Sequence, residues 1–268
     1  MIILDHDTAS IVLVIRGTFS IKDVVMDVVC EEEEFLDGFA HSGFLNGSRM
    51  VLSKCSSVLE KALCDNFGYG LVVCGHSMGG SVSIMVTMAL LSPGQASSLL
   101  PPGVEVRCVA LGPAPVFRIP GVRGFSSEVY RDKVHIFIND KDVVPRLSLG
   151  SVAQLLRVLR EIDGLSLSLD QQLAVIMWRR DEETEENRAK VRDIVSSVSQ
   201  DRFPFLYHPG SVFWLRSGAS PGSGSSVTVR GVTAEEAEAT AESLGVSETM
   251  VSDHIHTAYR DNFRKVHI

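Results

Sequence analysis

The sequence predicts an α/β fold in which a mostly parallel sheet carries helices on both faces. Short runs rich in β-branched residues alternate with helix-spaced apolar patterns along most of the chain. Several of these runs are apolar throughout, which is typical of strands buried on both faces of a sheet. One of them, at 71–74, ends in Gly75-His76-Ser77-Met78-Gly79, and a long apolar helix pattern follows at once.

Size and composition narrow the choice of protein class. The 268 residues are 45% hydrophobic, so we expect a single domain spanning residues 1–268, with a helical insertion at about 151–200. The net charge of −8 argues against nucleic acid as a partner. No apolar run reaches the roughly 18 residues of a transmembrane segment. The five cysteines form no C-x-x-C pair, which favours a cytoplasmic location.

The first half of the chain predicts alternating strands and helices. Residues 2–4 and 11–15 form a β-hairpin whose second strand is predicted to be fully buried. The elements expected after it are a helix at about 48–67, a strand at 71–74, a helix at 81–92, and strands at 104–111 and 134–138. Cys74 and Cys108 lie in these strands and are interpreted as small core residues.

The second half breaks this alternation at the predicted insertion. The elements expected there and beyond are helices at about 155–162 and 173–178, a solvated helix start at the acidic run 181–186, and strands at 211–216 and 227–230. Thr233 and Glu236 form a capping box, which opens a helix that Gly245 closes.

The G-x-S-x-G stretch makes Ser77 a candidate nucleophile. Between a strand and a helix, this pattern places the serine on a tight turn with its Oγ pushed out of the sheet. A side chain at Gly75 or Gly79 would collide with the neighbouring strand or helix. The amide of Met78 lies at a helix N-terminus, where positive partial charge can receive an oxyanion. The alternative is an ordinary glycine-rich turn that packs a helix onto a sheet.

A serine nucleophile needs a base within hydrogen-bond reach and an acid that orients the base. With a strand–turn–helix serine, the acid and then the base are expected later in the chain. Asp140 and Asp142 follow the strand at 134–138, at the edge where open α/β sheets place their sites. Each could instead be a turn-forming aspartate.

The candidate bases are the histidines after that acid: His208, His254, His256 and His267. His76 is too tightly placed in the turn to reach over Ser77. His208 lies in a turn and favours a structural role. His254 and His256 follow a loop and precede a helix pattern, which is a suitable place for a mobile imidazole. On position alone, either could instead be a lone surface histidine.

Motifs along nearly the whole chain then point to a family. They are Asp5-His6, Val14-Ile15-Arg16-Gly17-Thr18, Asp37-Gly38-Phe39-Ala40-His41-Ser42-Gly43-Phe44, the serine turn, Leu111-Gly112-Pro113, Asp142-Val143-Val144-Pro145-Arg146, Leu206-Tyr207-His208-Pro209-Gly210 and Asp253-His254. With these motifs the chain resembles the class 3 lipases, which have the α/β-hydrolase fold. Within that family it resembles the sn-1-specific diacylglycerol lipase-like branch.

The resemblance assigns a role to each site residue. It implies that Ser77 is the nucleophile, that Asp142 is the acid because the run after it fixes the register, and that His254 is the base because it directly follows an aspartate. It also implies an oxyanion hole formed by Thr18 and the amide of Met78. His41 receives no catalytic role.

The resemblance implies a lipid-ester hydrolase, a di- or triacylglycerol lipase, that works through an acyl-enzyme and needs no cofactor or metal. Its partner would be an acylglycerol at a membrane or lipid-droplet surface, with peripheral membrane contact. The alternatives are a phospholipase A1, an acyltransferase, or a non-catalytic lipid-binding scaffold. An apolar stripe at 21–29 is expected to be a lid or a helix packed on the core. If it is a lid, the run Glu31-Glu32-Glu33-Glu34 would be its solvated hinge.

Overall fold

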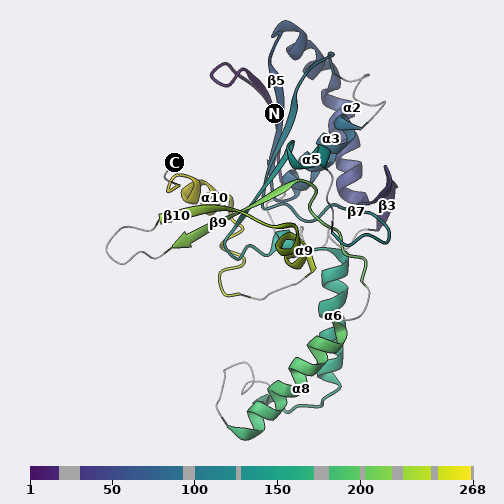
Figure 1. The fold of residues 1–268 in the computed structure, drawn as a ribbon, viewed down its shortest axis with the longest axis vertical. Helices are drawn as coiled ribbons and strands as arrows, with labels where there is room; N and C mark the ends of the chain where they lie inside the picture. Colours follow the sequence, from purple (N-terminus) through teal and green to yellow (C-terminus); the bar gives the residue numbers. More distant parts are fainter. Residues whose placement is uncertain are drawn as a thin grey trace. The chain divides into compact units, whose positions relative to one another are not determined.

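Figure 1 shows the fold of the protein in a computed structural model. The structure describes residues 1–17, 31–92, 100–124, 128–171, 181–199, 203–218, 226–242 and 247–266. It divides into two compact units. Unit 1 contains Met1–Ser148 and Phe205–Ile268, and unit 2 contains Leu149–Pro204. The predicted lid stripe at 21–29 lies outside the described residues.

Unit 1 is built on a mostly parallel sheet. In the described part of the chain this sheet has seven strands in the order β1-β2-β5-β6-β8-β9-β10 (Figure 1). The strands are β1 Ile2–Asp5, β2 Ser10–Ile15, β5 Gly70–His76, β6 Val106–Leu111, β8 Val134–Asn139, β9 Ser211–Gly218 and β10 Ser226–Gly231. Neighbours from β2 to β9 pair in parallel, whereas β1 and β10 are antiparallel edge strands. The predicted α/β class is confirmed.

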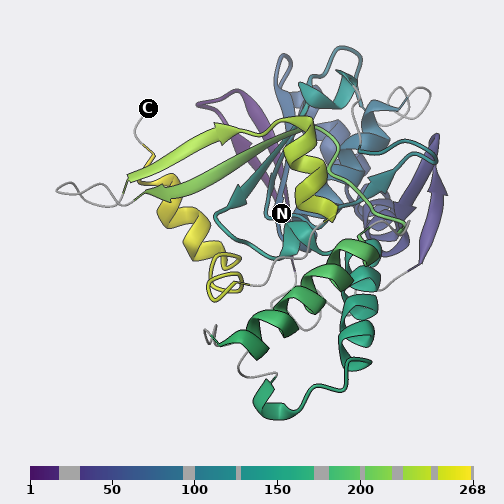
Figure 2. The same ribbon diagram turned by 60° about the horizontal axis from the view of Figure 1, so that its bottom comes forward.

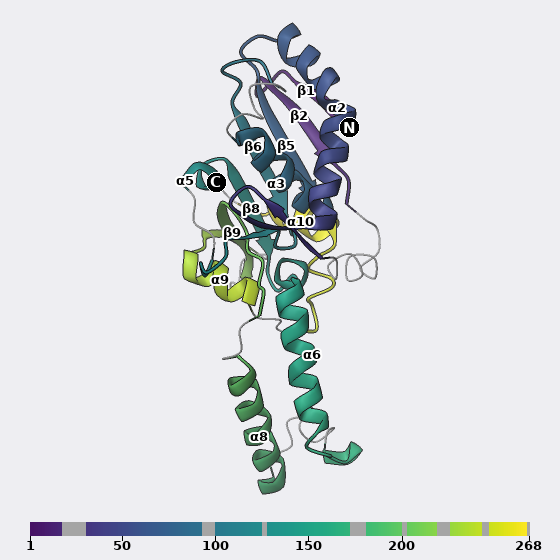
Figure 3. The ribbon, with the colours of Figure 1, turned by 90° about the vertical axis from the view of Figure 1, so that its right-hand side faces the viewer.

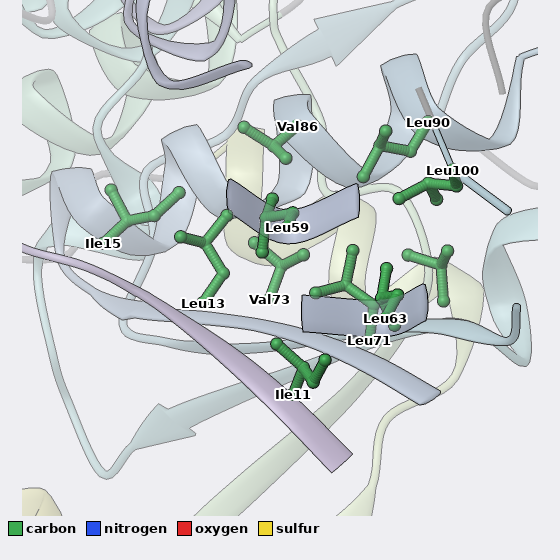
Figure 4. Packing of buried hydrophobic residues seen from close by; sticks show 11 residues of the cluster. Ile11, Leu13, Ile15, Leu59, Leu63, Leu71, Val73, Val86, Leu90 and Leu100 are labelled. Carbon is green, nitrogen blue, oxygen red and sulfur yellow. The ribbon is translucent and has the colours of Figure 1, made fainter. Parts of the chain in front are cut away.

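Helices α2 (Ser42–Asp65) and α3 (Met78–Leu91) cover one face of this sheet (Figure 3). Their apolar side chains meet those of β2 and β5 in the main core, shown in Figure 4. Leu59 and Leu63 of α2 and Val86 and Leu90 of α3 are buried there. Helix α3 is apolar almost all round because α2 lies on one side of it and the sheet on the other.

Helix α10 (His256–Phe263) contacts β9 on the other face of the sheet. Tyr259 is 1% exposed and packs with Leu215 of β9 and Val227 of β10. Phe263 lies edge-on to Phe137 of β8, with ring centroids 5.2 Å apart. This packing places α10 against the C-terminal ends of β8 and β9. The loop that carries Asp140 and Asp142 begins at the end of β8.

Strand β2 and helix α2 differ from their predictions. Strand β2 alternates between buried and half-buried residues, so the prediction of a fully buried strand was wrong. Cys74 is likewise half-buried, whereas Cys108 is buried as predicted. Helix α2 begins at Ser42 and not near residue 48. Its start escaped detection because it contains glycine and asparagine, which are poor helix formers; the His41 side chain caps it by accepting a hydrogen bond from the amide of Phe44.

The run of glutamates is part of a strand, so its interpretation as a solvated hinge was wrong. Over the described residues, β3 (Glu32–Phe35), β4 (Gly38–His41) and β7 (Phe117–Arg118) form a second, three-stranded sheet. The guanidinium Nε of Arg118 donates to both carboxylate oxygens of Glu32, at 2.9 and 3.0 Å. A cation from a distant part of the chain therefore neutralises a residue that looked solvated.

Unit 2 contains helix α6 (Leu149–Asp163) and helix α8 (Glu182–Val198), which lie side by side (Figure 2). Asp181 caps α8 by accepting a hydrogen bond from the amide of Thr184, so the acidic run starts a helix as predicted. The helix predicted at 173–178 lies outside the described residues. Among the helices that the structure describes, none combines the length and apolar character needed to cross a bilayer.

The remaining helices in the described part of unit 1 are short. They are α5 (Glu128–Arg131), the 3₁₀ turn Val144–Arg146, and α9 (Ala234–Glu242). The predicted capping box is confirmed at α9. The amide of Thr233 donates to a carboxylate oxygen of Glu236 at 3.0 Å, and the amide of Glu236 donates to the Thr233 hydroxyl at 3.2 Å.

Candidate active site

Ser77 lies at the sharp turn between β5 and α3. Its φ of +60° is rare for a residue with a side chain, and such strain persists only where the surroundings fix the backbone. A Cβ on Gly75 would lie 2.8 Å from the amide nitrogen of Gly80, and one on Gly79 would lie 2.7 Å from the carbonyl carbon of Arg16. Both glycines are therefore required by the close approach of α3 and of the end of β2, as predicted.

The structure brings Ser77 together with His254 and Asp142, which come from distant parts of the chain. The Nε2 of His254 lies 2.9 Å from the Oγ of Ser77, and its Nδ1 lies 2.9 and 3.0 Å from the two carboxylate oxygens of Asp142. An ionised carboxylate only accepts hydrogen bonds, so Nδ1 carries the proton and Nε2 is free to accept the hydroxyl proton of the serine. This is the hydrogen-bond relay that general-base catalysis requires.

All three side chains are withdrawn from solvent: Ser77 is 1%, Asp142 0% and His254 5% exposed. Water screens charges poorly in such surroundings, so hydrogen bonds to an ionised group are strong. The Asp142 carboxylate also accepts from the amide of Val144 at 2.9 Å and from the Tyr259 hydroxyl at 2.6 Å. These donors fix the orientation of the carboxylate against the imidazole.

Tyr259 is a supporting residue that the sequence did not reveal. Its hydroxyl donates to Asp142 and accepts from the amide of Asn139 at 3.0 Å. Burial and the charge of Asp142 raise the pKa of Tyr259 well above its usual value, so the hydroxyl keeps its proton and stays a donor. Gly112, with a φ of +53°, leaves the space for this pair, since a Cβ there would lie 2.6 Å from Asp142 and 2.7 Å from Tyr259. Helix patterning alone marks Tyr259 only as a core residue.

The loops that carry the acid and the base are tied together directly. The side-chain amide of Asn139 donates to the carbonyl of Asp253 at 2.9 Å, and the backbone amide of Lys141 donates to its carboxylate at 3.2 Å. Asn139 in turn accepts from the side chain of Asn262 at 2.6 Å. Asp253, the residue before His254, therefore links the two loops.

The other sequence candidates lie in different surroundings. Asp140 has a φ of +39° and accepts a hydrogen bond from the amide of Ser217, as expected of a turn residue. His208 is buried, and its ring nitrogen Nε2 lies 2.9 Å from the carbonyl oxygen of Pro145. His256 is the first residue of α10, and His267 lies outside the described residues.

Of the two predicted oxyanion donors, the structure describes Met78 but not Thr18. Met78 is the first residue of α3, where backbone amides point out of the helix end. Thr18 lies outside the described residues, which end on this side at Gly17. A Cβ on Gly17 would be 3.4 Å from the Cβ of Ser77. Gly17 therefore lies next to the serine.

Comparison with known proteins identifies the family. The model of the class 3 lipases matches residues 12–151, more than half of the chain. The chain belongs to the class 3 lipase family. The matched residues include the serine turn and Asp142.

Similar proteins include lipases from animals and fungi. Mouse diacylglycerol lipase-beta is 30% identical over 175 residues, which cover 60% of this chain and 24% of the mouse protein. A secreted mono- and diacylglycerol lipase of Penicillium cyclopium is 31% identical over 102 residues, covering 37% of this chain and 33% of that protein. The match therefore spans a quarter to a third of these relatives.

Solved lipase structures share the fold. Lipase II from Rhizopus niveus superposes with a TM-score of 0.56 at 18% identity, covering 94% of this chain and 72% of that one. At this identity the likeness concerns the fold, and it agrees with the α/β-hydrolase architecture expected from the motifs.

Proposed function

We propose that this chain is a lipid-ester hydrolase in which Ser77 is the nucleophile, His254 the base and Asp142 the acid that orients it. The observation that carries the proposal is the unbroken hydrogen-bonded series from the Ser77 hydroxyl through the His254 imidazole to the Asp142 carboxylate. A protein that merely binds a lipid has no physical need for this series.

The chemistry follows from the two nitrogens of His254. As Ser77 Oγ bonds to the acyl carbonyl carbon, Nε2 takes the hydroxyl proton, and Asp142 stabilises the resulting imidazolium through Nδ1. The carbonyl oxygen becomes an oxyanion, which the amide of Met78 and Thr18 receive. The ester bond then breaks, and the departing alcohol takes the proton from His254. Water repeats the sequence on the acyl-enzyme and releases the fatty acid.

We propose diacylglycerol as the first substrate to test, presented at a membrane or lipid-droplet surface. The support is that the similar mouse and Penicillium proteins are named for diacylglycerol. A cytoplasmic location stays a prediction from the cysteine pattern, and one of these relatives is named as secreted.

A fluorophosphonate probe tests the nucleophile, because it forms a covalent bond only with an activated serine. The wild type should be labelled and Ser77→Ala should not. Equal labelling of both proteins, or of neither, would remove Ser77 from the role.

Ester hydrolysis then tests the base and the substrate. His254→Ala should abolish activity, whereas His256→Ala should retain it, since His256 has no described contact with Ser77 or Asp142. The opposite result would assign the role of the base to His256. Assays with di-, tri- and monoacylglycerol, a phospholipid and an acceptor alcohol separate a lipase from a phospholipase A1 and an acyltransferase.

A further inference from the structure

His76, the residue between Gly75 and Ser77, contacts the candidate base in two ways. Its Nε2 lies 2.7 Å from the backbone carbonyl oxygen of His254, and a carbonyl only accepts, so Nε2 donates this hydrogen bond. The two imidazole rings are also stacked, with centroids 4.7 Å apart and planes at 29°. A single side chain therefore holds both the backbone and the ring of His254.

These contacts attach His254 at both ends to the same dipeptide. His76 donates to its carbonyl, and the hydroxyl of the adjacent Ser77 donates to its Nε2 at 2.9 Å. The rest of the segment before α10 consists of turns, which Asp253 also ties to Asn139 and Lys141. Among these ties, the bond from His76 is the one that fixes the backbone of the candidate base directly beside the candidate nucleophile.

The surroundings keep His76 uncharged. Its ring is half-buried, with Tyr259 edge-on at 5.5 Å and His256 edge-on at 6.4 Å. Burial, followed by the charge of His254, lowers the pKa of His76 to about 4. At neutral pH the stacked ring is therefore neutral, and it places no cation against the imidazolium that forms on His254 during the reaction.

We propose that His76 is a positioning residue for His254: its donated hydrogen bond and its stacked ring hold the imidazole in line with Ser77. The proposal rests on the proposed function, because it assigns to His76 the task of placing the general base. A ring that merely fills space is the alternative, and an aromatic side chain without a donor would serve that purpose equally well.

Two substitutions separate these roles. His76→Phe keeps a flat ring and removes the donor, whereas His76→Gln keeps a side-chain N–H donor and removes the ring. His256→Phe is the matched control, because it changes the neighbouring histidine, which makes only an edge contact with His76. For each protein we would measure kcat and KM on a soluble ester, the rate of fluorophosphonate labelling, and the midpoint of thermal unfolding.

His76→Phe is expected to lower kcat and the labelling rate about tenfold, which corresponds to about 1.4 kcal/mol in the barrier, with KM within about twofold. His76→Gln should recover part of that loss, and His256→Phe should match the wild type. A folded His76→Phe with wild-type kcat and labelling rate would overturn the proposal, as would a loss in His76→Gln equal to or larger than that in His76→Phe. If the wild type itself neither hydrolysed esters nor reacted with the probe, the proposed function would fail, and the role of His76 with it.

Discussion

Replacing Gly79 by alanine should disrupt the serine turn, because the new methyl group would collide with backbone atoms at the end of β2. Its Cβ would lie 2.7 Å from the carbonyl carbon of Arg16 and from the amide nitrogen of Gly17, and closer still to the carbonyl oxygen of Ile15. Non-bonded carbon atoms pack at about 3.5–4.0 Å. Because backbone atoms cannot rotate away, either α3 or the end of β2 must move by roughly 1 Å.

The cost follows from that displacement. Overpacking of a well-filled site typically costs about 1–3 kcal/mol, and a clash with fixed backbone belongs at the upper end. We therefore expect Gly79→Ala to lower the free energy of unfolding by about 3 kcal/mol. A 1 Å misplacement near a reacting group costs roughly a hundredfold in rate, so we expect fluorophosphonate labelling of Ser77 to slow by about that factor.

The neighbouring glycine provides a matched control. A Cβ on Gly80 would lie 3.1 Å from the carbonyl oxygen of Gly75 and 3.3 Å from a side-chain carbon of Pro113, contacts that a small shift can relieve. Alanine also favours a helix over glycine by about 1 kcal/mol. Gly80→Ala should therefore keep the free energy of unfolding within about 1 kcal/mol of the wild type.

Urea unfolding followed by tryptophan fluorescence measures the stability of each variant, and timed labelling measures the reactivity of the serine. The comparison is between two alanines on adjacent residues of one helix, so helix propensity cancels. Equal unfolding midpoints for Gly79→Ala and Gly80→Ala, together with equal labelling rates, would refute the steric argument.

Four further substitutions test the support of the site and the dependence of folding stability on pH. Tyr259→Phe should lower the free energy of unfolding by about 2 kcal/mol, because the Asp142 carboxylate loses a donor and the amide of Asn139 loses its acceptor; an unchanged urea midpoint would contradict this. Asp142→Asn should reduce kcat roughly a thousandfold or more, whereas Asp140→Asn should leave kcat within about threefold, and steady-state ester hydrolysis compares them. Burial lowers the pKa of His208 to about 4, below the value of 6.5 for an unperturbed histidine, so the unfolded chain is protonated first as the pH falls. The contribution of neutral His208 to stability is present above pH 6.5 and should be lost, by about 3 kcal/mol, as the pH falls towards 4. Urea unfolding at several pH values should show a smaller loss of stability in His208→Gln than in the wild type. Parallel plots of unfolding free energy against pH for the two proteins would exclude the effect.

The large sheet and the helices that cover it could be predicted because each strand and helix has a local sequence pattern. Each of the central strands contains its own apolar run, and the serine turn announces the switch from strand to helix within a few residues. The small sheet could not be predicted, because its first strand consists largely of glutamates. Arg118 lies far from Glu32 in the sequence, and only folding brings the two together. Their ion pair favours a strand at residues that the sequence alone marks as solvated.

The candidate site shows the same division. The order of serine, aspartate and histidine is written along the chain, but position alone did not separate Asp140 from Asp142. The difference lies in what each carboxylate contacts: the amide of Ser217 for Asp140, and the ring of His254 for Asp142. Tyr259 escaped notice because its hydroxyl finds its partners only when α10 packs against the sheet.

The place where unit 2 joins unit 1 has a consequence for how such chains diversify. The chain leaves unit 1 after Ser148 and returns at Phe205, so unit 2 is one continuous segment inserted at a single position. The free energy of closing a loop rises only with the logarithm of its length. Evolution can therefore lengthen, shorten or exchange this segment at little cost to unit 1, which holds Ser77, Asp142 and His254. Change in unit 2 can therefore accompany constancy in the three residues that we propose carry the chemistry.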